Sequence, residues 1–159
     1  MARLEKNSDQ PVKVRFYQLR ATTPENALVK IATKAISQGL RISVVAGNDE
    51  QAKWLDEYLW TVPANGFLPH GRSEEPDVEQ QPLVIGVSAD DRNEATVVIP
   101  LIWEPLLEPE QFDMVVDFVQ SSAPAAIVAS RKRYKFYRDA GCTMEYWVQE
   151  LDGRWQLKN

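Results

Sequence analysis

A cluster of cations near the end of the chain is the first candidate for a binding site. The stretch "RKRYKFYR", residues 131–138, holds five cations and no acid. At 100° per residue, one stripe of a helix at i, i+3, i+4 and i+7 would carry Arg131, Tyr134, Lys135 and Arg138. Lys132 and Arg133 diverge from that stripe. Three cations around a tyrosine ring predict a site for one or a few carboxylates. The alternative is that these cations are solvated and only complement the dipole at the helix C-terminus.

A second candidate is the apolar stretch "LWTVPANGFLPHG", residues 59–71, which is broken by prolines and a glycine. Its large apolar side chains are Trp60, Val62, Phe67 and Leu68. They could plug the core beneath a loop, or they could line a small pocket for an apolar side chain. Such a pocket beside the cationic stripe would suit an acidic peptide that ends in an aromatic residue and a free carboxylate.

Signatures of enzymes and nucleotide-binding proteins are missing. The turns "RATTPEN" and "AGNDEQ", which follow the first two expected strands, lack the glycine pattern of a phosphate-binding loop. There is no G-x-S-x-G elbow, and His70 is the only imidazole in the chain. We expect His70 to pack or to form a hydrogen bond inside its loop, and Cys142 to be a small buried hydrophobe.

Two other functions stay open on these residues. Carboxylates near strand ends could hold Mg²⁺ in a hydrolase or nuclease, and the candidates are Asp49, Asp90, Asp91 and Asp117. Asp49 serves equally well as a helix cap, and Asp117 lies in an apolar strand, where it faces solvent or pairs with a cation. A direct binder of single-stranded nucleic acid would use the basic helix, with Tyr134 and Trp60 as stacking platforms.

Composition narrows the choice of partner. The chain has 159 residues, which is about one domain, and a net charge of −5. Without the five cations of 131–138, 13 basic residues stand against 23 acidic ones, so duplex DNA is a poor partner.

One cysteine and one histidine allow no internal disulfide and no histidine-based zinc site. No signal peptide or membrane-spanning run is present, and we expect a cytoplasmic protein without metal or other cofactor.

The hydrophobic pattern predicts one α/β domain over residues 12–152, with flexible tails at 1–11 and 153–159. Expected strands cover 12–19, 40–47, 82–88, 95–102, 112–120 and 142–151, and the last of them is a candidate edge strand. Expected helices cover 22–39, 48–60 and 122–141, with Trp60 facing inward. This order favours an open, mostly parallel, mixed sheet with helices on both faces, like a Rossmann fold without its phosphate loop.

The motifs "LDEYLWTVPANGFLPHG", "FYQL" and "RKRYKFYRDAG" resemble those of the chi subunit of bacterial DNA polymerase III holoenzyme. The resemblance covers about residues 14–141. It implies an adaptor and not an enzyme. Such proteins bind the acidic, phenylalanine-terminated tail of single-stranded DNA-binding protein, and they bind the psi subunit, which tethers them to the clamp loader. Chi-like proteins can also pair with an iron–sulfur helicase.

The resemblance also implies which residues hold the tail. By motif they are Trp60, Phe67, Val119, Arg131 and Tyr134, and Lys135 is added because it lies on the same helical stripe. Arg131, helped by Lys135 or Arg138, would hold the carboxylates of the peptide. The apolar side chains would enclose its terminal phenylalanine. The psi-binding surface has no motif that can be transferred.

Overall fold

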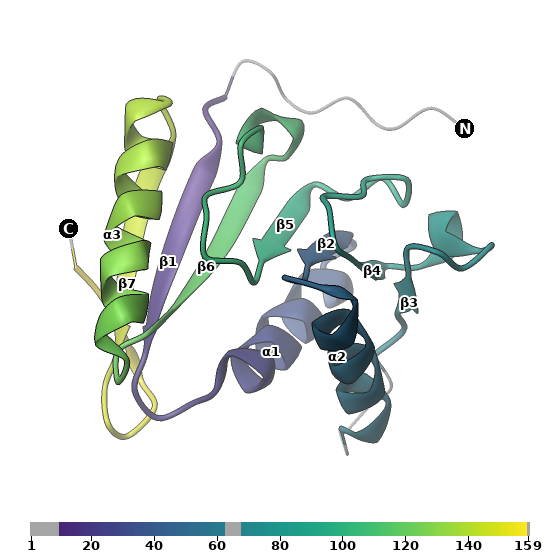
Figure 1. The fold of residues 1–159 in the computed structure, drawn as a ribbon, viewed down its shortest axis with the longest axis horizontal. Coiled ribbons are helices and arrows are strands. Elements are labelled where there is room, and N and C mark those ends of the chain that lie inside the picture. Colours follow the sequence, from purple (N-terminus) through teal and green to yellow (C-terminus); the bar gives the residue numbers. More distant parts are fainter. Residues whose placement is uncertain (1–9, 63–67, 159) are drawn as a thin grey trace.

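The computed structural model describes residues 10–62 and 68–158, which form a single sheet with helices on both of its faces (Figure 1). The strand order is β3-β4-β2-β5-β6-β1-β7-β8, and every pair is parallel except β7–β8. The strands are β1 Lys13–Leu19, β2 Ile42–Val45, β3 Gly71–Arg72, β4 Leu83–Gly86, β5 Val97–Pro100, β6 Met114–Gln120, β7 Thr143–Gln149 and β8 Trp155–Leu157. The described residues form three α-helices, α1 Pro24–Ser37, α2 Asp49–Thr61 and α3 Pro124–Asp139, and two short 3₁₀ turns, Val78–Gln80 and Pro109–Gln111. The predicted fold class is confirmed. No helix in the described part is long and apolar enough to cross a membrane.

The helices begin and end where the local sequence predicts. Thr23 Oγ1 accepts a hydrogen bond from Asn26 N at 3.3 Å, and Asn48 Oδ1 accepts one from Gln51 N at 2.8 Å. These contacts satisfy backbone donors that the first turn of a helix leaves unpaired. Gly39 and Gly141 follow α1 and α3 with φ angles of +83° and +91°, a conformation that glycine adopts without strain.

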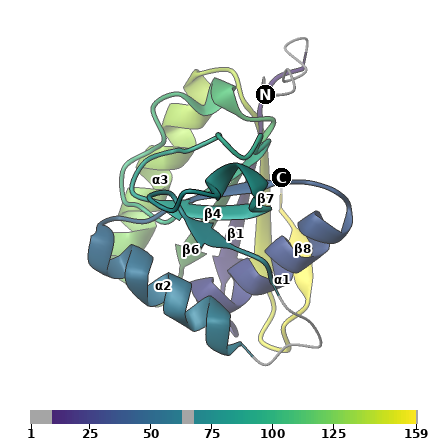
Figure 2. The ribbon, with the colours of Figure 1, turned by 90° about the vertical axis from the view of Figure 1, so that its right-hand side faces the viewer.

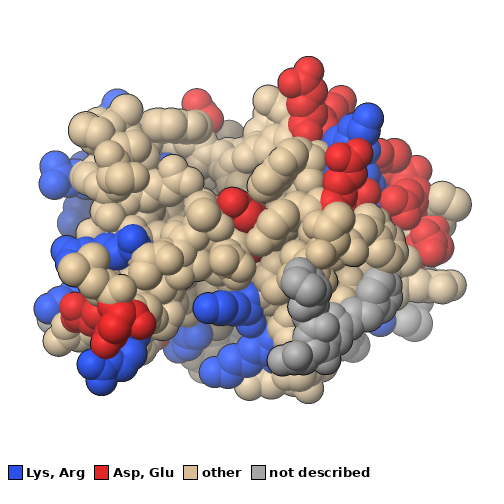
Figure 3. Space-filling model, turned by 90° about the horizontal axis from the view of Figure 1, so that it is seen from below, with Lys and Arg blue, Asp and Glu red and all other residues tan. Residues whose placement is uncertain are grey.

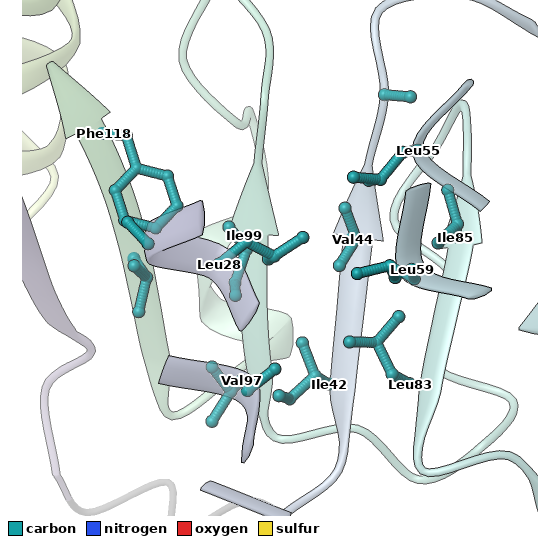
Figure 4. Packing of buried hydrophobic residues seen from close by; sticks show 14 of the residues in the cluster. Leu28, Ile42, Val44, Leu55, Leu59, Leu83, Ile85, Val97, Ile99 and Phe118 are labelled. Carbon is teal, nitrogen blue, oxygen red and sulfur yellow. The ribbon is translucent and has the colours of Figure 1, made fainter. Parts of the chain in front are cut away.

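Successive side chains of each strand point to opposite faces of the sheet, so the hydrophobic core has two parts, one on each face. On β6, Val116 and Phe118 point to the α1 and α2 side, whereas Val115 and Val119 point to the α3 side. The α1 and α2 side is the larger cluster, and Leu28 of α1 and Leu55 of α2 pack in it against strand residues (Figure 4). On α1 the buried residues Leu28, Ala32 and Ala35 lie on the face that packs against the sheet.

The C-terminal end of the domain differs from the prediction. The segment 153–159 was expected to be a tail, but β8 lies within it and pairs antiparallel with β7, with Trp155 opposite Gln149. β7 therefore lies between β1 and β8 and is not an edge strand. β8 has only three residues, all exposed, so its sequence carries too short an alternation to predict a strand. The expected N-terminal tail, 1–11, falls mostly outside the described residues.

The segment after β5 covers the α3 side of the sheet and is held there by a buried tyrosine. Leu106 and Phe112 of this segment are buried beside Tyr137 of α3. The backbone N–H of Leu106 donates to Tyr137 Oη at 2.7 Å, and burial raises the pKa of the Tyr137 hydroxyl.

Tyr137→Phe is expected to lower the free energy of unfolding by about 1–2 kcal/mol, because it leaves the buried Leu106 N–H without an acceptor. Urea denaturation followed by circular dichroism measures this loss. The half-buried Tyr17, whose hydroxyl takes part in no such hydrogen bond among the described residues, provides the matched control Tyr17→Phe. Equal losses in the two variants would show that the hydrogen bond to Leu106 contributes nothing.

Candidate peptide-binding site on α3

The basic segment of α3 contains one cation that points into the protein. The Arg133 side chain is only 7% exposed, whereas Arg131 and Lys132 are exposed. Arg133 Nε and Nη2 donate to the two carboxylate oxygens of Asp117 at 2.8 and 2.9 Å, and Nη1 donates to the backbone oxygen of Trp103 at 3.1 Å. Of the two environments predicted for Asp117, pairing with a cation is confirmed. The pair ties α3 to β6 and to the segment after β5.

The contacts of Arg133 favour the ionised form of the Asp117 carboxyl against the effect of burial. Burial raises the pKa of the Asp117 carboxyl, and the hydrogen bonds and charge of Arg133 act in the opposite direction. Both carboxylate oxygens accept N–H donors from the guanidinium, which is the bidentate geometry of a carboxylate–guanidinium ion pair. We therefore treat Arg133 as a structural residue, not as part of a binding surface.

Arg131 lies on the outer side of the same helix, next to two tyrosine rings. The half-buried ring of Tyr134 stands 5.3 Å from Phe16 and 6.3 Å from Tyr146, measured between ring centroids. The Tyr146 hydroxyl is 2.8 Å from Gln18 Oε1. Burial raises the pKa of Tyr146, and the nearby Arg131 charge partly offsets that rise. Arg131, Tyr134 and Tyr146 thus form one cluster, which we call the α3 site.

Of the three cations on the predicted stripe, Arg131 alone has no carboxylate partner among the described residues. Lys135 Nζ lies 2.5 Å from Asp139 Oδ2, and Arg138 Nε lies 3.5 Å from Asp139 Oδ1. The side-chain hydrogen bond from Lys135 is the main cause of the lowered pKa of Asp139. On the face seen in Figure 3, acidic side chains gather mainly at the right, and a smaller acidic group lies among the cations at the left. Arg131 is therefore the cation of the stripe that is available to a carboxylate from outside.

Val119 lies beneath this helix and not on its surface. It is 1% exposed and belongs to the core cluster on the α3 side, together with Phe16 and Tyr137. It can shape the α3 site from below. It reaches a bound peptide only if the residues above it move.

Trp60 does not lie with the α3 site. It is at the C-terminal end of α2, on the opposite face of the sheet, and its ring is 4.5 Å from that of His70. The prediction that Trp60 faces inward is wrong, because it is 56% exposed. Leu55 and Leu59 already occupy the inward positions of α2, and Trp60 lies 100° around the helix from Leu59. Phe67, the other aromatic residue of that stretch, lies outside the described residues.

His70 has the structural role that was expected. Its side chain is buried, with Nδ1 2.8 Å from the backbone oxygen of Leu68 and Nε2 3.1 Å from Asp56 Oδ1. Both ring nitrogens are thus engaged within the loop and the neighbouring helix. This arrangement leaves no imidazole nitrogen directed toward a substrate.

The aspartates that could hold Mg²⁺ do not converge. Within residues 10–62 and 68–158, no group of three or more metal-ligating side chains could hold an ion. Asp117 is occupied by Arg133, and Asp90 pairs with Arg92 at 2.6 Å. The side-chain hydrogen bond from Arg92 is the main cause of the lowered pKa of Asp90. The hydrolase alternative has no support in this geometry.

Tyr146 is the member of the α3 site that sequence reasoning did not name. Its signal was the alternation of 142–151, which places Met144 and Tyr146 on the same side of β7. That side faces α3, but the sequence alone does not say so.

Comparisons with known proteins agree with the sequence motifs. The family model described as "DNA polymerase III chi subunit, HolC" matches residues 12–145. The chain is 29% identical over 136 residues to the DNA polymerase III subunit chi of Pseudomonas aeruginosa, covering 84% of this chain and 94% of that protein. It is 31% identical over 118 residues to the protein of the same name from Escherichia coli K12, covering 74% and 80%.

Proposed function

The chain belongs to the DNA polymerase III chi subunit family, and on that basis we propose that it is a replication adaptor. Membership makes it an accessory, non-catalytic subunit of DNA polymerase III. In our proposal the α3 site binds the acidic C-terminal tail of single-stranded DNA-binding protein, and the psi subunit links the chain to the clamp loader. The observation that carries the tail site is Arg131, an exposed cation beside the ring of Tyr134 with no carboxylate partner among the described residues.

The α3 site has the chemistry that such a tail requires. The guanidinium of Arg131 can donate two parallel hydrogen bonds to the terminal carboxylate of a peptide. The rings of Tyr134 and Tyr146 offer an apolar wall to a terminal phenylalanine. Both rings pack on Phe16, at 5.3 and 6.0 Å, so little side-chain entropy is lost when a peptide binds. Lys135 adds positive potential for aspartates farther along the tail.

Direct binding of a nucleic-acid strand is a weaker interpretation of the same helix. A strand needs a row of cations that follows its phosphates. Arg133 is buried against Asp117, and Lys135 and Arg138 share Asp139. The net charge of −5 opposes phosphate elsewhere on the chain. A short acidic peptide needs only a local site.

The decisive experiment compares three ligands at fixed ionic strength. We expect saturable, micromolar binding of a fluorescent peptide that copies the acidic tail, because only a short segment becomes ordered. The same peptide without its terminal phenylalanine should bind at least about tenfold more weakly, since it loses both the ring and the placement of the carboxylate. A matched oligonucleotide should not bind. Preference for the oligonucleotide over the tail peptide would refute the proposal.

Trp60→Ala is expected to leave the affinity for the tail peptide unchanged within about twofold, because Trp60 and the α3 site lie on opposite faces of the sheet. Fluorescence anisotropy with the same labelled peptide measures this. Tyr134→Ala, which removes a ring from the site itself, provides the contrast. A large loss in Trp60→Ala with a stable fold would bring Trp60 back into the tail site.

The second partner that we propose, the psi subunit, is supported by the family alone, and an iron–sulfur helicase is the alternative. Co-purification of the chain with each candidate distinguishes the two. If the adaptor proposal is right, a bound psi subunit should leave the affinity for the tail peptide intact, since a linker must hold both partners at once.

A further inference from the structure

A groove of about 510 Å³ lies between α1 and the β7–β8 hairpin, on the face of the sheet opposite α3. Figure 2 shows β8 running beside α1 on this side of the molecule. The floor of the groove consists of Val97, Met114 and Val116. Lys30, Ile31 and Lys34 of α1 form one wall, and Tyr17, Gln149 and Trp155 form the other.

The groove exists because α1 leaves part of this sheet face uncovered. Arg15 lies on β1, which has strand neighbours on both sides, and yet its side chain is 33% exposed. The indole of Trp155 meets the ring of Tyr17 edge-on, with centroids 5.1 Å apart. Gln149 donates to Thr22 Oγ1 at 2.9 Å and accepts from the backbone N–H of Ala21. These contacts fix the hairpin wall, so the groove is formed before any ligand arrives.

The charge of the groove is opposite to that of the whole chain. Its lining contains Arg15, Lys30 and Lys34 and no aspartate or glutamate, in a protein of net charge −5. The two lysines are exposed, lie one helical turn apart, and form no ion pair with a described residue. Arg15 Nε is 3.1 Å from Glu145, but its two Nη groups donate no hydrogen bond to a described residue. The groove therefore offers two lysines, unpaired among the described residues, to an anionic ligand, and Arg15, which Glu145 partly neutralises, adds to the positive potential of its floor.

We propose that this groove is a second binding site, which takes an acidic segment of a partner protein with an apolar side chain inserted among the carboxylates. The apolar side chain lies over Val97, Met114 and Val116, and the carboxylates face Lys30 and Lys34. A nucleobase fits less well, because an aliphatic floor would leave its polar edge buried without a hydrogen-bond partner.

The second site is independent of the α3 site. The two lie on opposite faces of the sheet, so both can be occupied at once. The hairpin wall, with Gln149 and Trp155, lies beyond residues 12–145, which are the part of the chain that matches the family model. The floor of the groove and its α1 wall lie within that region, so only part of one wall extends beyond it.

The test uses a fluorescein-labelled peptide that alternates aspartate with leucine and has an amidated C-terminus, so it lacks the free carboxylate proposed for the α3 site. We expect saturable binding that the double variant Lys30→Glu, Lys34→Glu weakens by about tenfold or more. Trp155→Ala should weaken it too, since it removes one wall. Lys53→Glu, an exposed cation of α2, and Arg131→Ala should both leave the affinity within about twofold.

Three results with the alternating peptide would overturn the second site. They are the absence of saturable binding, an equal loss in Lys53→Glu, and a loss in Arg131→Ala, which would assign the peptide to the α3 site. Tighter binding of an oligothymidine, lost in the double lysine variant, would also overturn it by identifying a nucleic-acid groove. Because the charged variants change only exposed side chains, their melting temperatures should stay close to that of the unmodified chain. If Arg131→Ala still binds the alternating peptide, the second site functions whether or not the α3 site binds the tail.

Discussion

Arg133→Met is expected to lower the free energy of unfolding by about 3–5 kcal/mol, the largest stability loss that we expect from a change within the basic segment. The substitution leaves the Asp117 carboxylate, which is 1% exposed, without its cation and without two hydrogen bonds. It also frees the backbone oxygen of Trp103. Urea denaturation at neutral pH measures the loss.

Arg131→Met is the matched control, because it makes the same chemical change two residues earlier on an exposed side chain. Its effect on stability should be under about 0.5 kcal/mol. The double variant Asp117→Leu, Arg133→Met should recover much of the loss, since an apolar pair needs no charge compensation. If Arg133→Met were as stable as Arg131→Met, the buried pair would not anchor α3 to β6.

The contrast between Arg131 and Arg133 shows how far a sequence can assign side chains to a surface. Helical periodicity correctly separated Arg133 from the stripe that carries Arg131 and Tyr134. It also left two environments for Asp117, of which the structure confirms one. What it could not supply was the contact between Arg133 and Asp117, because that depends on where α3 lies across β6. Local sequence patterns determine which residues share one face of a helix. The packing of distant segments determines which strand that face contacts.

The separation of Trp60 from Arg131 was beyond the sequence for a related reason. The face that a helix covers follows from the strand order, because crossover connections are right-handed. Strand order depends on pairing between distant segments, such as β1 with β6 and β7. The resemblance to the family's motifs assigned Trp60 and Arg131 to one site. The topology of the sheet is what places them on its opposite faces. By contrast, helix caps depend on a few adjacent residues: Thr23 caps α1, and Asn48, not the neighbouring candidate Asp49, caps α2.

β8 was not predicted from the sequence, because its stability comes from pairing with β7. Trp155 and Leu157 are exposed and alternate over only three residues, which no periodicity argument can distinguish from a tail. The pairing of Trp155 with Gln149 and its contact with Tyr17 hold the strand in place. The groove beside α1 could not be predicted from the sequence either, because one of its walls is the β7–β8 hairpin.

Arg131→Glu is expected to weaken binding of the acidic tail peptide on the order of 100-fold, because it replaces an attraction to the terminal carboxylate with a repulsion. The residue is exposed, and no described carboxylate pairs with it, so the substitution should not change the stability of the domain. Fluorescence anisotropy with the labelled tail peptide measures the affinity. Binding to the unmodified chain should weaken as salt is raised, since the contact is between charges at the surface.

Lys132→Glu is the matched control, with the same change of net charge on the next residue of the same helix. Lys132 points about 100° away from Arg131, so its effect should be confined to the general potential, about threefold or less. Equal losses in the two variants would show that the tail responds only to the charge of α3. A loss confined to Arg131→Glu would identify a specific carboxylate contact, and the rings of Tyr134 and Tyr146 would then be the next residues to replace.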